Sequence, residues 1–394
     1  MRRFKSRSVT AVSEVVVAGA GIAGLSAGIA LARKGIRASV YDAAQKGALE
    51  GSGLTISAIG MRAIRDLGLG AEVARLGAGS SETIIADVAG HQFDKIAMPP
   101  LAGADLPAMG GIMRATFHEL LLETAEANGV AVHFGNGLAG LQPSDGGVRV
   151  QFADGQQLET PLLVGADGIY SRVRELAFPD APSPAPTGQR VWRVLIHVNP
   201  EFVGRHHGMW YGPNVKAGIT PLSETDAYMF VVENCDDPVR PPREQWPSLV
   251  KDQLADFADV IGWVRDTQIG DPARIDCRPL HAILVPLPWH RGRVVLIGDA
   301  IHATTPHMAS GAAMAMEDGI VLADLLAEQS GVEAALRKFG EVRWERCRVV
   351  NENSLQLGEW EKHPADPAAD PGRLIGESLG FLAQPYRPSS APAP

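Results

Sequence analysis

The amino-acid sequence predicts an α/β fold in which a parallel sheet is interrupted by an inserted β-rich domain and closed by a C-terminal helical segment. Two observations support this prediction. Short, continuously apolar runs such as residues 14–18 are typical of parallel strands buried on both faces, and glycine-containing turns and helical periodicity follow them. Between residues 186 and 274 the apolar runs alternate in part, which is typical of an antiparallel sheet.

Composition limits the possible classes of protein. The chain has 394 residues, 45% of them hydrophobic, and a net charge of −9, so it is long enough for two domains and too apolar to be disordered. The acidic balance argues against nucleic acid as a partner. Cys235, Cys277 and Cys347 have no metal-binding or disulfide spacing, so we expect a reducing, cytoplasmic location.

The first unit along the chain is a strand, a glycine-rich turn and a helix. The strand at residues 14–18 ends directly before the turn, and helical periodicity begins at Ile22. The turn has the G-x-G-x-x-G pattern of Gly19, Gly21 and Gly24. The first glycine permits a tight turn, the second lets a pyrophosphate approach the backbone, and the third lets helix and strand pack closely. The helix N-terminus then offers free N–H groups to a diphosphate.

A second strand, residues 37–41, leads to Asp42, where a carboxylate is expected to meet an adenosine ribose. The unit therefore predicts a dinucleotide site without deciding between NAD and FAD. Residues 15–32 could instead be a signal peptide or a membrane span. Their glycines would weaken a membrane helix, so we expect no membrane association.

The same segment contains Gly24-Leu25-Ser26-Ala27-Gly28, which matches the G-x-S-x-G motif of serine hydrolases. That motif requires its serine on the sharp turn between strand and helix. Ser26 is expected about one turn inside the helix, where its hydroxyl would face the backbone. A serine hydrolase using Ser26 is the alternative from another functional class.

Two later segments repeat the pattern of a buried strand followed by an acidic residue. Residues 162–175 contain a strand, Asp167 and the start of a helix. Residues 293–319 contain a strand, Asp299, a loop with a proline and a helix of small residues from about Gly311. Carboxylates at the C-terminal ends of parallel strands can accept hydrogen bonds from sugar hydroxyls at the crevice where ligands bind.

Arg114 opens a helix predicted over residues 116–128, whose Thr116 and Glu119 have the spacing of a capping box. Together with the segments above, it makes the sequence resemble the class A flavoprotein monooxygenases, the para-hydroxybenzoate hydroxylase superfamily, from residue 14 to about residue 350. The resemblance implies a Rossmann-like, discontinuous FAD-binding domain with an inserted substrate domain. It also implies FAD as cofactor, NADH or NADPH as co-substrate, and molecular oxygen with a small aromatic ring as substrates.

The resemblance further implies roles for individual residues. Asp42 would bind the adenosine ribose, Asp299 the ribityl hydroxyls, and Asp167 the region of the pyrophosphate and the nicotinamide cofactor. Arg114 would lie along the ribityl and phosphate side of the flavin. The helix from Gly311 would point its N-terminus at the pyrimidine end and stabilise the negative charge of reduced flavin. The cofactor-binding residues expected in this way are Gly19, Gly21, Ala23, Gly24, Asp42, Arg114, Asp167, Asp299, Pro306, Gly311 and Ala312.

Two positions depart from the family pattern. Ala309-Ser310-Gly311 stands where relatives often have Gly-Gln-Gly, so the glutamine side chain is lost while backbone donors remain. Ala48 stands where an arginine is common, so Arg114 is expected to contribute more to cofactor binding.

The resemblance and the change in sequence texture together predict the domain organisation. Residues 1–185, completed by residues 275–345, would form the FAD-binding domain. Residues 186–274 would form the substrate-binding β-sheet domain. Residues 346–394 would form a C-terminal helix and a Pro/Ala-rich tail in which we recognise no chemistry. We expect a monomer or a homodimer.

Three residues are candidates for catalysis: His307, His207 and Tyr211. His207 and Tyr211 are four residues apart and would share one face of a strand, whereas His307 lies in the loop before the proposed flavin helix. Each could hold or deprotonate a phenol or a hydroxylated N-heterocycle. The alternative is that they are packing residues and surface histidines. His302 and His307 are five apart on an irregular loop, so no metal site is expected.

The expected function is FAD-dependent, NAD(P)H-consuming hydroxylation of a small aromatic or N-heteroaromatic ring through a flavin hydroperoxide, as in the similar hydroxylases of salicylate, hydroxynicotinate and alkylquinolones. Alternatives on the same fold are epoxidation, Baeyer–Villiger oxidation, halogenation, and flavin binding without turnover.

Overall fold

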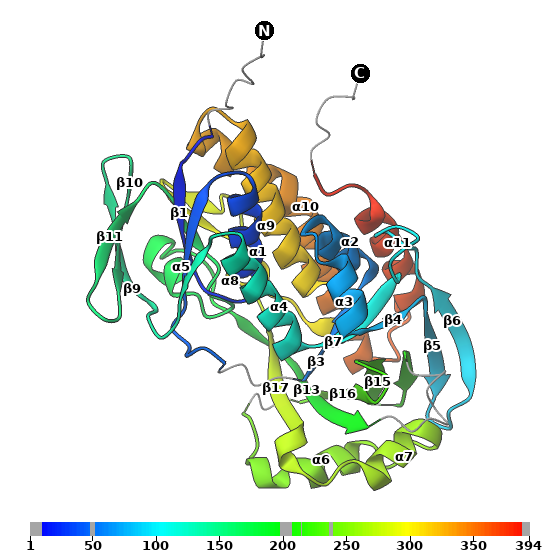
Figure 1. Cartoon of the computed structure of the whole chain (residues 1–394). Coiled ribbons are helices and arrows are strands. Elements are labelled where there is room, and N and C mark those ends of the chain that lie inside the picture. The colour runs from blue at the N-terminus through cyan, green and yellow to red at the C-terminus, as the bar shows by residue number, and fades with distance from the viewer. Residues whose placement is uncertain (1–9, 48–51, 198–206, 214, 236–238, 388–394) are drawn as a thin grey trace.

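The computed structural model describes residues 10–47, 52–197, 207–213, 215–235 and 239–387. Two sheets dominate this part of the chain (Figure 1). A six-stranded sheet lies with the long helices in the upper part of the view, and a seven-stranded sheet lies at the bottom, above α6 and α7. The predicted α/β class is confirmed.

The six-stranded sheet contains the strands predicted from apolar runs. Its order is β18-β19-β12-β1-β2-β8, and every pair is parallel except the pair of β18 with β19. The strands are β1 (Glu14–Ala18), β2 (Arg37–Tyr41), β8 (Ala131–His133), β12 (Leu163–Gly165), β18 (His290–Arg291) and β19 (Val294–Leu296). Because β1 lies between β2 and β12, the C-terminal ends of three predicted strands meet at one edge.

Two helices built from small residues pack closely beside this sheet. A Cβ added at Gly319 of α9 (Gly311–Glu328) would lie 2.6 Å from the backbone nitrogen of Ala27 in α1 (Ile22–Arg33). Ser26 lies in the interior of α1 with no exposed surface. The serine hydrolase alternative is therefore wrong, because helix packing places this hydroxyl where no substrate can reach it.

The predicted capping box is also wrong. Helix α4 (Arg114–Ala127) begins two residues earlier than expected, after Met113, and no side chain caps it. Strand β7 (Met109–Met113) runs directly into the helix, and the Arg114 N–H donates to the Ser52 carbonyl over 3.2 Å. Strand pairing therefore sets the start of α4, and Thr116 lies inside the helix.

The seven-stranded sheet has the order β17-β13-β16-β15-β14-β5-β6. The apolar runs between residues 186 and 274 form antiparallel strands as expected: β13 (Ala185–His197), β14 (Gly208–Tyr211), β15 (Val215–Pro221) and β16 (Asp226–Asn234). Strands β5 (Glu82–Asp87) and β6 (Gln92–Ala97) extend it through a parallel pair with β14, and β17 (Ile275–Ala282) forms the other edge. Helices α6 (Trp246–Gln253) and α7 (Asp259–Thr267) cover the outer face, around a core that includes Trp192 and Trp246.

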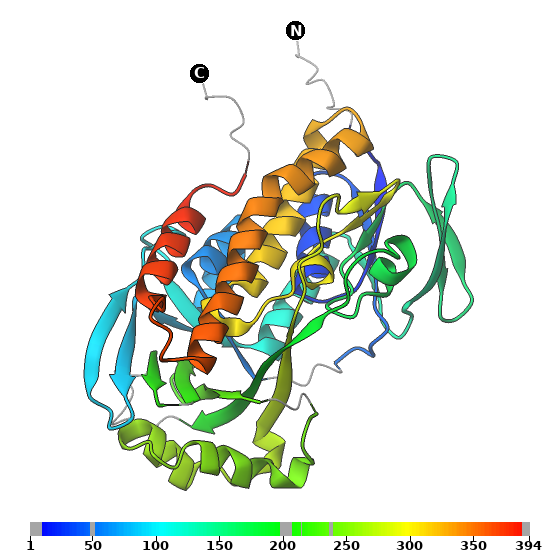
Figure 2. The same cartoon turned by 180° about the vertical axis from the view of Figure 1, so that it is seen from behind.

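The C-terminal region contains a helix that the sequence did not predict. After α10 (Val332–Lys362) the chain forms α11 (Pro371–Ala383), which lies beside α10 in the rear view (Figure 2). Arg62 and Arg346 donate to the Leu382 carbonyl at the end of α11 over 3.0 and 2.9 Å, and both arginines pair with the buried carboxylate of Glu317. The end of α11 is therefore held against α2 (Ala58–Asp66) and α10.

Shorter elements complete the described chain. One three-stranded sheet contains β9 (Leu138–Ser144), β10 (Gly147–Phe152) and β11 (Gln157–Thr160), and another contains β3 (Gly53–Ile56), β7 and β4 (Ala78–Ser80). The remaining α-helices are α2 (Ala58–Asp66), α3 (Gly70–Leu76), α5 (Arg172–Ala177) and α8 (Asp299–His302). None of the helices in the described ranges has the length and apolar character needed to cross a membrane.

Candidate functional site

A cavity of about 790 Å³ extends from the glycine turn after β1 to the inner face of the seven-stranded sheet. Ten of the eleven residues expected to bind the cofactor line it: Gly19, Gly21, Ala23, Asp42, Arg114, Asp167, Asp299, Pro306, Gly311 and Ala312. Gly24 does not line the cavity, because it lies under the turn. Residues separated by up to 293 positions in the sequence thus meet around one space, which we divide into a turn end and a sheet end.

The glycines of the turn have different roles. Gly19 has a φ of +106°, and a Cβ there would lie 2.3 Å from the Ala166 carbonyl oxygen. A Cβ on Gly24 would lie 1.8 Å from the Gly19 carbonyl oxygen. Gly21, in contrast, lines the cavity, and a Cβ there would meet no atom of the described residues within 4 Å. Gly19 and Gly24 are therefore required by the protein itself, whereas Gly21 leaves a cradle that a ligand can fill.

Two carboxylates stabilise the backbone at the turn end. Asp42 accepts hydrogen bonds from the backbone N–H groups of Ala20 (2.6 Å) and Ala44 (2.7 Å), which holds the glycine turn against the end of β2. Asp167 accepts from the Ser171 hydroxyl and from the Val173 N–H at the start of α5. Burial raises the pKa of Asp167. Both side chains also line the cavity.

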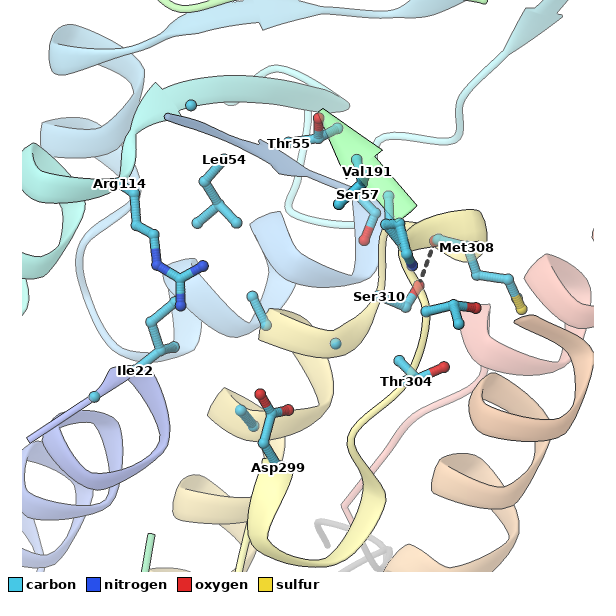
Figure 3. Close-up of a pocket in the computed structure, with 18 of the residues that line it drawn as sticks. Ile22, Leu54, Thr55, Ser57, Arg114, Val191, Asp299, Thr304, Met308 and Ser310 are labelled. Atoms are coloured by element: carbon cyan, nitrogen blue, oxygen red, sulfur yellow. Dashed lines mark hydrogen bonds between the residues drawn. The ribbon is translucent and has the colours of Figure 1, made fainter. Parts of the chain in front are cut away.

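Arg114 and Asp299 project into the cavity from opposite walls (Figure 3). The guanidinium of Arg114 extends from the start of α4 toward Ile22 at the start of α1, and Asp299 lies at the start of α8. Both residues are exposed to the cavity, and no other described residue forms a hydrogen bond with either side chain. Burial lowers the pKa of Arg114, and attraction to Asp299 opposes that effect. An unpaired cation in a cavity is suited to an anionic ligand.

Helix α9 points its N-terminus into the same space. Gly311, Ala312 and Ala315 from its first turns line the cavity. The Ser310 hydroxyl donates to the Met308 carbonyl over 2.7 Å and is therefore used inside the loop (Figure 3). Only backbone N–H groups and the helix dipole are left to act on a ligand here. Ala48, the other departure from the family pattern, lies outside the described residues.

The sheet end of the cavity is mostly apolar. Its walls come from the seven-stranded sheet, from β7 and from α11: Ile96, Met98, Met109, Val191, Met209, Ile219, Phe230, Val232, Leu280, Ile375 and Leu379. Polar groups are few. The Thr55 hydroxyl bonds the Thr220 hydroxyl (2.9 Å) and the Tyr228 hydroxyl, so one polar cluster crosses from β3 to the sheet. Such a space suits a ring-shaped ligand with one or two polar substituents.

Two of the three candidate catalytic residues line the cavity. Burial lowers the pKa of His207 to about 4, so its imidazole is neutral at pH 7, and its buried Nδ1 has no hydrogen-bond partner among the described residues. Tyr211 is not among the lining residues. It lies at the end of β14 with 36% of its surface exposed, and its hydroxyl contacts the Met209 sulfur at 3.8 Å.

His307 lies in a hydrogen-bonded series at the cavity wall. Its Nδ1 is 2.8 Å from the Thr305 hydroxyl, and its Nε2 is 3.1 Å from a carboxylate oxygen of Glu361. Glu361 also forms an ion pair with Lys216 of β15. Burial lowers the pKa of His307, and the positive charge of Lys216 adds to that effect. Burial alone would raise the pKa of Glu361, but Lys216 and His307 lower it to about 2.

Sequence reasoning missed Lys216 and Glu361. Lys216 interrupts an otherwise apolar strand, and this could have been noticed in the sequence. The structure shows that the lysine is almost fully buried, as is typical of a lysine only when it has a partner. Glu361 lies in an amphipathic helix rich in charges, 145 residues further along the chain, and carries no such signal.

A second buried cluster resembles a metal site in composition. Ligand atoms of His302, Asp318 and Cys347 lie within 4.8 Å of one another. However, Asp318 accepts hydrogen bonds from His302 (2.7 Å) and from the fully buried Arg343 (2.8 Å). Burial alone would lower the pKa of His302, but Cys347 and Asp318 raise it well above its ordinary value. These hydrogen bonds and ion pairs join α8, α9 and α10.

Comparisons with known proteins agree with this geometry. The model of a family described as an FAD binding domain matches residues 12–353. The aurachin C monooxygenase/isomerase of Stigmatella aurantiaca is 29% identical over 358 residues, covering 88% of this chain and 90% of that protein. The 3-amino-4-hydroxybenzoate 2-monooxygenase of Streptomyces platensis is 30% identical over 373 residues, covering 90% and 89%. A crystal structure of Klebsiella pneumoniae HpxO with FAD and uric acid has a similar fold, with a TM-score of 0.78 at 24% identity, covering 96% of this chain and 98% of that one.

Proposed function

This chain belongs to the FAD binding domain family, within the class A flavoprotein monooxygenases, and from this premise we propose that it is a single-component, FAD-dependent hydroxylase of a small aromatic or N-heteroaromatic ring. It would use NADH or NADPH and molecular oxygen. One observation carries the proposal: a single cavity joins a turn end lined by the glycine turn and its carboxylates to a sheet end lined mostly by apolar side chains.

The turn end fits FAD. The open space at Gly21 would take the pyrophosphate, beside the N-terminus of α1. Asp42 would bind the adenosine ribose, and the unpaired Asp299 carboxylate would accept from the ribityl hydroxyls. Arg114 would contact the flavin side of the pyrophosphate. The N-terminus of α9 would face the pyrimidine end of the flavin, because the N–H groups of a helix's first turn have no partner within the helix. Bound FAD, once reduced, supplies the activation of molecular oxygen.

The residues of the sheet end would exclude water and orient the ring. Neutral His207 and the hydroxyls of Thr55 and Tyr228 offer hydrogen bonds to a ring hydroxyl or N–H. Lys216 and Arg193 also line the space, but each has a carboxylate partner, Glu361 and Asp276. Relatives named for hydroxylation of 3-hydroxybenzoate and 6-hydroxynicotinate support a ring substrate with at least one ionisable substituent.

We also propose a cellular location and an oligomeric state for this protein. Cys235, Cys277 and Cys347 form no disulfide in the described part of the chain, which supports a reducing, cytoplasmic location. We propose a monomer or a homodimer, which size-exclusion chromatography with light scattering would distinguish.

The test is a panel assay with purified, FAD-supplemented protein. Hydroxylated benzoates, pyridines and quinolones are scored for NAD(P)H oxidation, for hydrogen peroxide and for hydroxylated product. The proposal expects a yellow protein and at least one ring that is hydroxylated in proportion to the NAD(P)H consumed. A protein that retains no FAD would overturn it. If the protein retains FAD but forms an epoxide, a lactone or a halogenated product, it catalyses one of the alternative reactions on the same fold.

A further inference from the structure

Four polar side chains form a continuous series from the cavity to the protein surface. Thr305 lines the cavity, and its hydroxyl bonds His307 Nδ1 at 2.8 Å. His307 Nε2 bonds Glu361 at 3.1 Å, and Glu361 is paired with Lys216. The side chain of His307 is only 1% exposed, whereas that of Glu361 is 22% exposed. His307 and Lys216 line the cavity as well, so the series lies along the cavity wall and reaches solvent at Glu361.

The chemistry of the partners fixes the direction of each hydrogen bond. Glu361 is ionised, because its pKa is about 2, and a carboxylate can only accept hydrogen bonds. His307 must therefore carry its proton on Nε2. Burial keeps the pKa of His307 below its ordinary value, so the imidazole is neutral and Nδ1 is an acceptor. The Thr305 hydroxyl then donates to Nδ1, and its oxygen still has a lone pair that can accept a hydrogen bond.

We propose that Thr305, His307 and Glu361 form a directed proton path that removes a proton from a hydroxyl or N–H group of the bound ring, and that Lys216 is a positioning residue that holds Glu361. This inference rests on the proposed function for the identity of the ring, but the path itself is a property of this chain.

The transfer is balanced in atoms and charge. The O–H or N–H bond of the ring breaks, and its electron pair remains on the ring as an anion. Thr305 Oγ1 gains this proton and gives its own to His307 Nδ1. His307 passes its Nε2 proton to Glu361, whose exposed edge releases it to water. The ring anion is richer in electrons than the neutral ring, which favours attack by an electrophilic oxygen.

The packing around His307 also points to this arrangement. Gly358 lies within the last two turns of α10, and glycine inside a helix costs about 1 kcal/mol relative to alanine. A Cβ at this position would lie 2.7 Å from Gln189 Oε1 and 3.2 Å from His307 Cε1. Helix α10 thus lacks a side chain at the point where the His307 ring passes toward Glu361.

Other charges near the path come from two elements. Lys362 on α10 lowers the pKa of His307, and it donates to the Thr187 carbonyl and to Glu359. Tyr211 on β14 interacts electrostatically with Lys216 and Glu361, and burial raises its pKa, so it is neutral. Glu361 is therefore the anion that balances Lys216 at this site, and it is the one that contacts His307.

The first test is the tautomer of His307, which needs neither turnover nor substrate. Protein labelled with nitrogen-15 histidine is examined by NMR at pH 7, and the His307 signals are assigned by their loss in His307→Asn. The proposal expects a neutral ring with the proton on Nε2. A proton on Nδ1 alone, or a charged ring, would overturn the path whatever the protein catalyses.

The second test is the effect of Glu361→Gln on turnover of a ring that the panel identifies. The glutamine carbonyl can accept the His307 hydrogen bond but cannot take up a proton at neutral pH. We expect a loss of about 10²-fold in kcat, with unchanged FAD content and KM. Added formate should restore part of the rate, because Glu361 is partly exposed. The acid limb of the pH profile should move to lower pH, since the carboxylate raises the His307 pKa.

Matched variants complete the design. Glu359 lies on the same helix, and its side chain is 52% exposed. We expect Glu359→Gln to leave kcat unchanged. Thr305→Val removes the first hydroxyl with little change in shape, and it provides the same test of kcat if Glu361→Gln does not fold. Unchanged kcat in either folded variant, or a loss that formate does not reverse in Glu361→Gln, would overturn the path. A wild-type protein that turns over no ring would overturn the proposed function instead, while the tautomer still tests the path.

Discussion

The two ends of the cavity are built in different ways. At the turn end, the positions of Gly19, Gly24 and Asp42 follow from the backbone geometry where parallel strands finish. At the sheet end, the surface is made by side chains that project from β-strands and from α11. The difference teaches that a cofactor site can be determined by local backbone shape, whereas a substrate site depends on how distant elements pack. Variants at the two ends should therefore fail in different assays.

The largest effect is expected from Gly24→Val. Its Cβ would lie 1.8 Å from the Gly19 carbonyl oxygen, so the turn and α1 must move apart. We expect a loss of at least about 3 kcal/mol in the free energy of unfolding, measured by chemical denaturation. The matched change is Gly21→Ala, whose Cβ meets no atom of the described residues within 4 Å. It should retain the stability of the FAD-free protein and bind FAD more weakly. Equal stability of Gly24→Val and the wild type would contradict this division of roles.

His307→Ala should produce the next largest effect, confined to the sheet end. Removal of the imidazole breaks the contacts with Thr305 and Glu361, and we expect kcat to fall by about 10³-fold. FAD content, read from the flavin absorbance per protein, should stay the same. His363→Ala, at an exposed position just after α10, is the control. Loss of flavin together with activity would show that the two ends are not separable at this residue.

Asp299→Ala tests the turn end, where we expect FAD binding to weaken. The carboxylate is exposed to the cavity and has no hydrogen-bond partner among the described residues, so its removal should cost little stability. We expect FAD affinity to fall by about 10-fold to 100-fold, as for loss of hydrogen bonds to a charged group. Titration of the FAD-free protein followed by flavin fluorescence measures this change. Asp94→Ala, on the exposed strand β6, should bind FAD like the wild type.

The same contrast explains what the sequence could predict. The strands of the parallel sheet, the glycine turn and the acidic residues at strand ends are encoded in short segments, so the turn end could be assembled from motifs. The start of α4 was misplaced because strand pairing, rather than a capping box, determines it. The contact between His307 and Glu361 joins residues 54 positions apart through tertiary packing, which leaves no local pattern.

Helix α11 is the clearest case of this limit. The segment was expected to be a Pro/Ala-rich tail, yet it forms a helix that supplies part of the cavity wall. Its position depends on hydrogen bonds from Arg62 and Arg346, which lie on two other helices. A composition-based prediction cannot include such contacts, because the partners are far away in the sequence.

The smallest effect is expected from a variant that tests whether α11 contributes to ring binding. Leu379 of α11 lines the sheet end, and Leu379→Ala removes apolar surface that would otherwise contact the ring. We expect KM to rise about 5-fold, because loss of one or two methylene contacts costs about 1 kcal/mol. FAD affinity and the free energy of unfolding should change little, since Leu379 is only partly buried. Phe381→Ala is the control, because that side chain lies on the same helix with 39% of its surface exposed. If Leu379→Ala left KM unchanged, this side chain would not contribute to ring binding, and the apolar contacts with the ring would come from the other residues that line the sheet end.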